Sequence, residues 1–397
     1  MKSVTKLILV SALFVFLSAC QSTDRLRVNA GQNAKPGVFL DSQFNGYKNV
    51  KVETAANIFA LSDEMKLMAQ RIGSERNTRT KAKKLLQHFF SPEHINLAYK
   101  SGANVIAAQA YKNKEANCLS LTIMAYAIAQ EADLNVAFQS VDVPEYWVRN
   151  GRVNMLTGHI NLAVLQPKTP QKVLFWQRND MEIDFDPYVL KKSFPKHRID
   201  KNTVLAMFYN NKGANAMVDG DYVIAYAYLR AATKIAPLFS PAWGNLGILY
   251  RFKGYEKSAI ATYQHAISLD RNNLTAMSNL SMLLHINGEY EKAKQLDNHI
   301  MRKRANNPYY YALLGDERFY QGAYKEAINH YKKAIKLNDS IHELYFGLAK
   351  VYYMLDEVEK AKSYMKKAMA KNRIARLDKQ YLAKLNFLRQ THVSKLP

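Results

Sequence analysis

The chain has 397 residues, of which 48% are hydrophobic and 22% are charged, so it holds enough apolar material for packed cores and is not wholly disordered. Scarce glycine and proline argue against an all-β sandwich, and two cysteines alone exclude a small disulfide-stapled scaffold. The net charge of +23 is spread along the chain rather than gathered into one patch, so no nucleic-acid partner is expected.

The first nineteen residues have the pattern of a targeting segment. Lys2 and Lys6 are followed by an apolar run, residues 7–17, that is too short to cross a bilayer and typical of a signal-peptide core. The run ends in Leu-Ser-Ala-Cys at residues 17–20. This ending resembles the lipobox of bacterial lipoproteins, in which Cys20 would be lipidated and become the first mature residue. The alternative is an ordinary secretory signal with an incidental cysteine.

The lipobox resemblance also implies a location. Gln21 follows Cys20 where an aspartate would imply retention in the inner membrane. The expectation is therefore an outer-membrane lipoprotein of the Gram-negative envelope, facing the periplasm and anchored by acyl chains such as palmitate. Residues 20–50 are polar and irregular, and we predict that they form the lipidated tether.

Residues 51–204 are predicted to form an α+β domain. Residues 118–129 are apolar and rich in alanine, which is typical of a buried helix, and Asn117 is a good N-cap for it. This cap places Cys118 in the first turn, where the helix dipole favours a thiolate. Strand-like runs follow at residues 136–141, 159–165, 172–176 and 181–186.

A candidate catalytic set lies in this domain. Cys118 begins a helix, His159 opens a strand, and Asp186 precedes Pro187 at the end of a later strand. This order resembles the transglutaminase-like fold of the papain-like cysteine enzymes. The resemblance implies that Cys118 is the nucleophile, His159 the base and Asp186 the residue that orients the imidazole. Asp184 competes with Asp186, because strand alternation puts both on one face.

Structural roles compete with this catalytic interpretation. A single cysteine on an apolar helix is usually a small core residue, and a lone histidine is usually structural. Two features favour chemistry at Cys118, namely its place in the first turn and its status as the sole unlipidated thiol in an oxidising compartment. No metal-ligand spacing and no glycine-rich phosphate loop is visible, so neither a metal nor a cofactor is expected.

The carboxy-terminal half is repetitive. Glycines recur every 34 residues, at 220, 254, 288 and 322, and alanines recur at the same period from 225 to 361. The pattern resembles the tetratricopeptide repeat, with five repeats over residues 205–375 and a cap helix over residues 376–397. The third repeat departs from it, with Ser281 for glycine and Asp297 for an aromatic residue. The fifth has Asp356 at the turn glycine.

Asparagines recur on the first helix of repeats one to three, at Asn211, Asn245 and Asn279. Such a row resembles the asparagine ladder of peptide-binding solenoids. An amide side chain is both donor and acceptor, so it can pair with an extended backbone of any sequence. The alternative is that asparagine is simply common at this position of the repeat.

Two functions follow from the sequence. The first is cysteine-dependent amide chemistry on a protein or peptide held by the repeats, with hydrolysis by a protease or amidase preferred over transglutaminase-like amine transfer. The second is a non-catalytic envelope scaffold that binds protein partners through the repeats.

Overall fold

The computed structural model describes residues 16–19, 38–91, 95, 97–100, 102–150, 153–165, 181–185, 194–372, 381–384 and 386. Cys20 and most of the predicted signal peptide lie outside these ranges. The described residues form two compact units. The larger unit comprises residues 16–143 and 148–297, and the smaller unit comprises residues 144–147 and 298–386.

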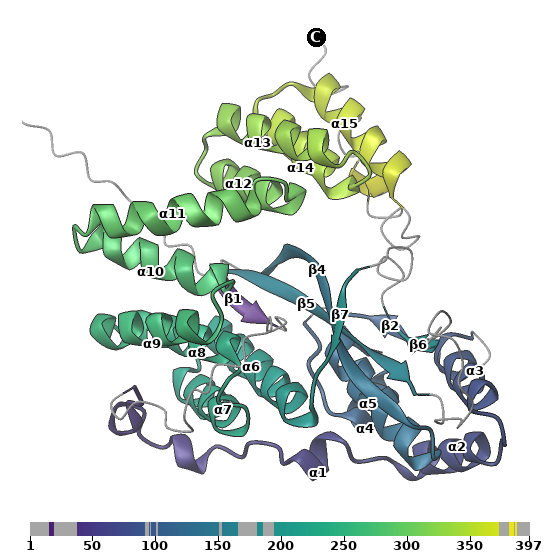
Figure 1. Ribbon diagram of the computed structural model, residues 1–397. Helices are drawn as coiled ribbons and strands as arrows, with labels where there is room; N and C mark the ends of the chain where they lie inside the picture. Colours follow the sequence, from purple (N-terminus) through teal and green to yellow (C-terminus); the bar gives the residue numbers. More distant parts are fainter. Residues whose placement is uncertain are drawn as a thin grey trace, which may run out of the picture. The chain divides into compact units, whose positions relative to one another are not determined.

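The amino-terminal part of the larger unit combines helices with a sheet (Figure 1). Its helices are α1 (Ala55–Ile58), α2 (Asp63–Gly73), α3 (Thr78–Phe90), α4 (Ala107–Asn113) and α5 (Cys118–Glu131), preceded by the 3-10 turns η1 (Asp41–Gln43) and η2 (Tyr47–Asn49). Its strands are β1 (Phe16–Ala19), β2 (Ala98–Tyr99), β3 (Glu115–Ala116), β4 (Val136–Asn150), β5 (Val153–Val164), β6 (Met181–Ile183) and β7 (Lys196–Arg198).

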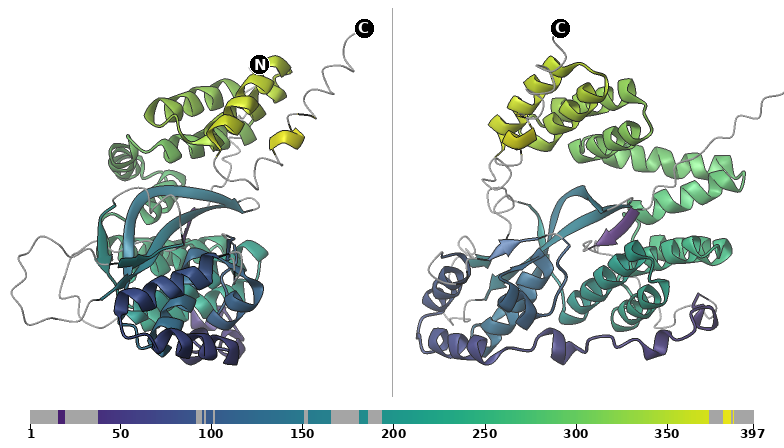
Figure 2. Two further views of the ribbon diagram at one scale, coloured as in Figure 1. Left: turned by 90° about the vertical axis from the view of Figure 1, so that its right-hand side faces the viewer. Right: turned by 180° about the vertical axis from the view of Figure 1, so that it is seen from behind.

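Strand β5 is central to the main sheet, whose order is β1-β5-β4-β7 with β6 also on β5. Strand β4 takes one edge of β5. On the other edge, β1 runs parallel to β5 opposite residues 154–157, and β6 runs antiparallel opposite residues 162–164. Figure 2 shows the β1 arrow beside this sheet from behind. Strands β2 and β3 form a separate parallel pair.

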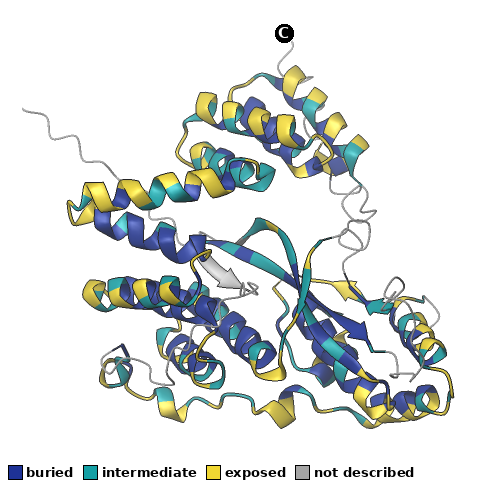
Figure 3. Cartoon of the chain, viewed as in Figure 1, coloured by how far each residue is buried: buried dark blue, intermediate teal, exposed yellow. Residues whose placement is uncertain are grey.

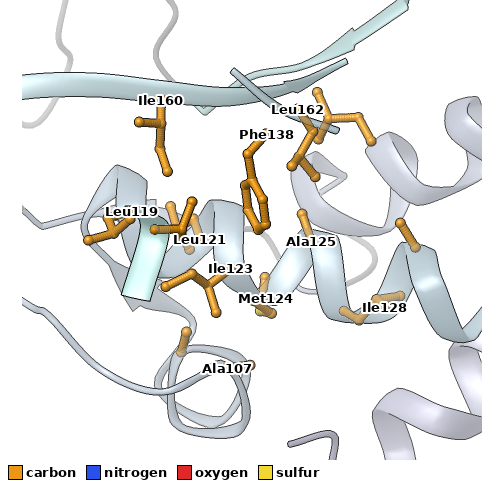
Figure 4. Close-up of a cluster of buried hydrophobic side chains, with 14 of the residues drawn as sticks. Ala107, Leu119, Leu121, Ile123, Met124, Ala125, Ile128, Phe138, Ile160 and Leu162 are labelled. Carbon is orange, nitrogen blue, oxygen red and sulfur yellow. The ribbon is translucent and has the colours of Figure 1, made fainter. Parts of the chain in front are cut away.

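Helix α5 lies in the core, as its sequence predicts. It has no polar face, so it is stable only when it is covered on nearly every side. Leu119, Ile123 and Met124 point into a cluster that also contains Phe138 of β4 and Ile160 of β5 (Figure 4). The helix lies against β5, α2 and α4, and most of its residues are buried, which Figure 3 colours dark blue.

Paired helices follow at the predicted period. The pairs in the larger unit are α6 (Lys201–Asp219) with α7 (Tyr222–Ile235) and α8 (Ser240–Phe252) with α9 (Glu256–Leu269), followed by α10 (Leu274–Ile286) and the start of α11 (Tyr290–Arg304). The pairs in the smaller unit are α12 (Pro308–Tyr320) with α13 (Tyr324–Leu337) and α14 (His342–Met354) with α15 (Val358–Lys371). The chain therefore contains a helical repeat solenoid, as the sequence predicts.

The turns between paired helices explain the 34-residue glycine period. Gly220, Gly254, Gly288 and Gly322 have φ angles of 85°, 77°, 78° and 77°. These left-handed values suit glycine because a side chain there meets its own backbone. In the fifth repeat Asp356 adopts φ 59° at the same position, so the turn geometry is retained where the glycine is lost.

The third repeat replaces a close helix contact by a polar one. A Cβ added to Gly247 would lie 2.6 Å from the ring of Tyr263, so glycine and the aromatic ring fit together there. In the third repeat Ser281 Oγ donates to Asp297 Oδ1 at 2.5 Å. The two departures from the repeat pattern therefore compensate each other across one pair of helices.

Residues 38–50 are not a free tether, contrary to the expectation for residues 20–50. Phe44 is buried and stacks on Tyr226 with ring centroids 4.2 Å apart. Tyr250 donates its hydroxyl to the Val38 carbonyl at 2.8 Å. This part of the segment is therefore fixed to the first two repeats by aromatic packing, and residues 20–37 lie outside the described residues.

In the smaller unit a buried ion pair joins residues 144–147 to the end of α11. Arg304 is 1% exposed and donates through Nε and Nη2 to the two oxygens of Glu145, at 2.6 and 2.9 Å. Asn307 Nδ2 donates to the Glu145 carbonyl at 2.8 Å. Of the predicted cap helix, residues 381–384 and 386 are helical, and Tyr381 lies 2.8 Å from His342 Nδ1.

None of the helices in the described ranges has both the length and the apolar character that a bilayer crossing requires.

Candidate active site

The start of α5 is fixed by its cap, as predicted. Asn117 has extended backbone angles, and its Oδ1 accepts the Ser120 N–H at 2.9 Å. Its Nδ2 donates to Asn104 Oδ1 at 3.4 Å, and Asn104 donates in turn to the Phe208 carbonyl. Cys118 therefore stands in the first turn of a helix whose entry angle is set by a buried hydrogen-bonded chain.

Two hydroxyls attach α5 to its neighbours. Ser120 Oγ accepts the Val105 N–H at 2.9 Å, and Thr122 Oγ1 donates to the Ile160 carbonyl at 3.3 Å. The second bond fixes α5 against β5 one residue after His159. Cys118 Sγ lies 3.9 Å from the Gly158 carbonyl oxygen, so the thiol faces the same stretch of β5.

The imidazole of His159 pairs with a buried carboxylate. His159 Nε2 lies 2.9 Å from each oxygen of Asp184. Asn161 Nδ2 donates to Asp184 Oδ2, also at 2.9 Å. His159 and Asp184 are 3% and 2% exposed, so the pair is shielded from water. Because Nε2 is engaged by Asp184, Nδ1 is the ring nitrogen left for Cys118.

The charges around His159 favour its protonated form. Burial by itself lowers the pKa of His159. The hydrogen bond that His159 donates to Asp184, the hydrogen bond with Cys118 and the charges of both partners oppose this effect and raise the pKa to about 10. The imidazolium is therefore stable at neutral pH, which is the state that pairs with a thiolate.

Among the described residues, Asp184 is the carboxylate that contacts His159. The sequence assigned this contact to Asp186 and left Asp184 as the competitor on the same strand face. Asp186 lies outside the described residues, so its own assignment stays untested. The observed orienting carboxylate is Asp184, which follows directly after β6.

Asn161 is a site residue that the sequence argument missed. It is fully buried and lies two residues beyond His159 on β5, so both side chains share one face of the strand. The signal was present in the alternation of β5, where a polar residue at this spacing interrupts an apolar run. The buried amide donates to Asp184 Oδ2, one of the two oxygens that contact the imidazole.

The asparagine ladder lies on the expected helices. Asn211 is on α6, Asn245 on α8 and Asn279 on α10, and all three are buried. Asn245 Nδ2 donates to Asn210 Oδ1 at 2.8 Å, and Asn279 Nδ2 donates to the Thr275 carbonyl at 2.9 Å. The peptide-binding role of the three residues remains a prediction.

Other kinds of site are not formed in the part of the chain that the structure describes. No group of three His, Cys, Asp or Glu side chains gathers there as metal ligands would. A surface hollow between Phe59, Tyr126 and Lys201 lies at the other end of α5 from Cys118 and contains neither the thiol nor the imidazole.

Comparison with known proteins matches the repeats. Models of the tetratricopeptide repeat match residues 240–273 and 262–295, and a model of the TPR repeat matches residues 315–356. A TPR repeat-containing protein of Methanocaldococcus jannaschii is 34% identical over 112 residues, which are 28% of this chain and 19% of that protein. The chain thus spans about a fifth of the length of this curated relative.

Three solved structures are among those that are similar to the chain. MamA is 22% identical, with a TM-score of 0.26, and is matched over 91% of its length and 42% of this chain. PilF of Pseudomonas aeruginosa is 18% identical, with a TM-score of 0.30 over 96% of its length and 50% of this chain. A tetratricopeptide repeat protein of Parabacteroides merdae is 21% identical, with a TM-score of 0.30 over 75% of its length and 48% of this chain.

The matched residues coincide with α8 to α10 and α12 to α14 and with the period of the turn glycines. Such solenoids present continuous surfaces and generally bind protein partners. Because the repeat models match at this period and on these helices, the chain carries tetratricopeptide repeats.

Proposed function

We propose that this protein is an envelope lipoprotein that binds a polypeptide through its repeats and cleaves an amide bond in it with Cys118. The observation that carries the proposal is the buried cluster of Cys118, His159 and Asp184, in which the imidazole is hydrogen-bonded to both other groups. The transglutaminase-like resemblance supports the same roles, with Asp184 in place of Asp186.

The proposed reaction has two halves, formation of a thioester and its hydrolysis, and Cys118, His159 and Asp184 act in both. The Cys118 thiolate attacks the carbonyl carbon, and the N–H of Cys118 at the helix start stabilises the oxyanion. The C–N bond then breaks, a thioester forms, and the His159 imidazolium gives its proton to the leaving amine. Water attacks the thioester while His159 takes its proton, which releases the carboxylic acid and restores the thiolate. Asp184 fixes the ring and stabilises its charge throughout.

Hydrolysis is proposed over amine transfer because water is abundant in the periplasm. Amine transfer, the transglutaminase-like alternative, would give a cross-linked product instead of two shorter ones. The two products differ in mass, so the same experiment separates them.

The experiment is substrate trapping with the chain in its own envelope. Wild type and Cys118→Ala are purified with bound partners and analysed by mass spectrometry for new termini. We expect an intact partner with Cys118→Ala and the same partner cut at a defined bond with wild type. An identical, uncut partner in both preparations would overturn the cleavage proposal.

A second candidate function is a non-catalytic scaffold, and the matches of the repeats to tetratricopeptide models favour it. In that case the Cys118 cluster only joins α5 to β5. Cys118→Ala would then change neither the partner's mass nor its affinity, whereas loss of the repeats would abolish capture.

A further inference from the structure

One edge of β5 is arranged to accept an extended polypeptide. Strand β1 lies on this edge in parallel orientation, with Phe16 opposite Asn154 and Ala19 opposite Thr157. Within the described residues, the same edge carries no strand between Thr157 and Leu162, where β6 begins its pairing. His159 lies in that interval. The stretch of the edge that β1 occupies therefore ends two residues before His159.

The repeat solenoid forms the wall of this edge. Helices α6, α8 and α10 all lie against β1, and they are the helices that carry Asn211, Asn245 and Asn279. Val153 and Met155 of β5 pack against the apolar cluster of the first repeats. Figure 1 shows β1 between β5 and these helices. A strand at this position is thus bounded by a backbone edge on one side and by solenoid helices on the other.

A buried polar group of β5 at this edge lacks a hydrogen-bond partner. Asn154, opposite Phe16 on β5, is 3% exposed and its Nδ2 has no partner. Leaving such a group unpaired costs free energy, so a ligand that supplies a partner to it gains affinity.

We propose that this edge binds an extended segment of a partner polypeptide as a strand parallel to β5. The inference rests on the proposed lipoprotein processing, because cleavage after Ala19 removes β1 from the mature chain and opens the edge. Strand addition recognises mainly backbone, so the partner needs an extended stretch. The apolar cluster beside this edge favours apolar or small side chains in that stretch. The parallel register sends its carboxy-terminal end past Thr157 to Gly158 and His159, beside the Cys118 thiol.

The first test measures binding to the open edge. The probe is a fluorescein-labelled peptide with the sequence of residues 14–19, FVFLSA, and two amino-terminal lysines for solubility. Its anisotropy is titrated with the chain that begins at residue 20 and carries Cys20→Ser. We expect saturable binding, weakened at least tenfold when the peptide is N-methylated at its last four residues or when the chain retains residues 1–19. No binding, or equal binding in all cases, would overturn the proposal.

A milder variant keeps the test independent of folding. Asn279→Ala on α10 should weaken the peptide about two- to tenfold, the usual effect of one hydrogen bond. Asn287→Ala, at the exposed end of the same helix, should leave binding unchanged. Equal effects of the two substitutions would place the peptide elsewhere.

The second test measures direction. The same peptide carries an acrylamide at either its carboxy or its amino terminus. The Cys118 sulfur adds to the terminal carbon of the double bond, and the neighbouring carbon takes a proton. We expect the carboxy-terminal acrylamide to label Cys118 at least tenfold faster, and equal or reversed rates would overturn the parallel orientation.

Iodoacetamide separates this proposal from the proposed chemistry. If the peptide binds as expected but iodoacetamide leaves Cys118 unlabelled, the docking edge is supported and the amide chemistry is overturned. If iodoacetamide labels Cys118 but the peptide does not bind, the docking edge is overturned and the chemistry stands.

Discussion

At the residue scale, the reactivity of Cys118 depends on the protonation of His159, on which two opposing effects act. Burial favours a neutral imidazole at His159, and a nearby carboxylate and thiolate favour the charged one. Both oxygens of Asp184 lie 2.9 Å from His159 Nε2. The attraction of the imidazolium to Asp184 and Cys118 therefore outweighs the effect of burial, and the pKa of His159 is raised to about 10. The imidazole of His159 is therefore protonated at neutral pH.

Asp184→Asn removes this attraction while retaining the shape of the site. The alkylation rate of Cys118 in wild type should be nearly constant from about pH 6.5 to 9, below the raised pKa of His159. In Asp184→Asn the rate should rise with pH like that of an ordinary thiol, whose pKa is about 8.5. Rates of iodoacetamide alkylation measured by mass spectrometry would show the difference.

Asp142→Asn is the matched control, because Asp142 pairs with His197 at 3.5 Å outside the site. It should keep the wild-type profile. A flat profile in Asp184→Asn would mean that Asp184 does not determine the protonation of His159.

The sequence could predict Cys118 and His159 but not the choice between two aspartates. The Asn117 cap places Cys118 at the start of a helix, and the order of residues along the chain indicates His159. Strand alternation in the sequence would put Asp184 and Asp186 on one face, so the sequence alone does not choose between them. The register of β6 places Ile183 opposite Leu162, which brings Asp184 next to Asn161 and diagonal to His159. Register across a long connection has no local sequence signal.

At the element scale, the repeats were predictable because each turn imposes a backbone geometry that few residues tolerate. A left-handed φ at one position per 34 residues leaves a visible row of glycines. The packing of residues 38–50 has no comparable sequence pattern, because Phe44 and Tyr226, which stack on each other, are far apart in the sequence. A polar, irregular composition therefore predicted a tether where aromatic contacts fix residues 38–50.

Gly254→Ala tests the turn argument. No atom lies within 4 Å of an added Cβ there, so the only penalty is the positive φ of 77°. We expect the free energy of unfolding to fall by about 1–2 kcal/mol. Urea denaturation with an unchanged m-value would measure it.

Asp356→Gly is the opposite substitution at the fifth turn, where φ is 59°. It should leave stability unchanged or raise it by up to about 1 kcal/mol. Loss of stability in Asp356→Gly together with no loss in Gly254→Ala would contradict the turn argument.

At the scale of the whole molecule, one chain carries the proposed targeting segment, the candidate active site and the helical repeats. The proposed acyl chains on Cys20 would be its strong apolar anchor, since several chains on one residue hold a protein stably at a membrane. Cys20→Ser, made in the full chain, should therefore move the protein from the membrane fraction to the soluble periplasm. Fractionation followed by immunoblotting measures this, and a membrane fraction that stays unchanged would refute lipid anchoring at Cys20.

The pairing of Cys118 with His159 is tested by alkylation of Cys118 at pH 6.5 in wild type and in His159→Ala. Both chains begin at residue 20 and carry Cys20→Ser, and circular dichroism checks that both are folded. We expect labelling of wild type within minutes at low iodoacetamide and at least tenfold slower labelling of His159→Ala, because the thiolate loses its imidazolium partner. Equal rates in two folded chains, or an inert Cys118 in wild type, would contradict this pairing.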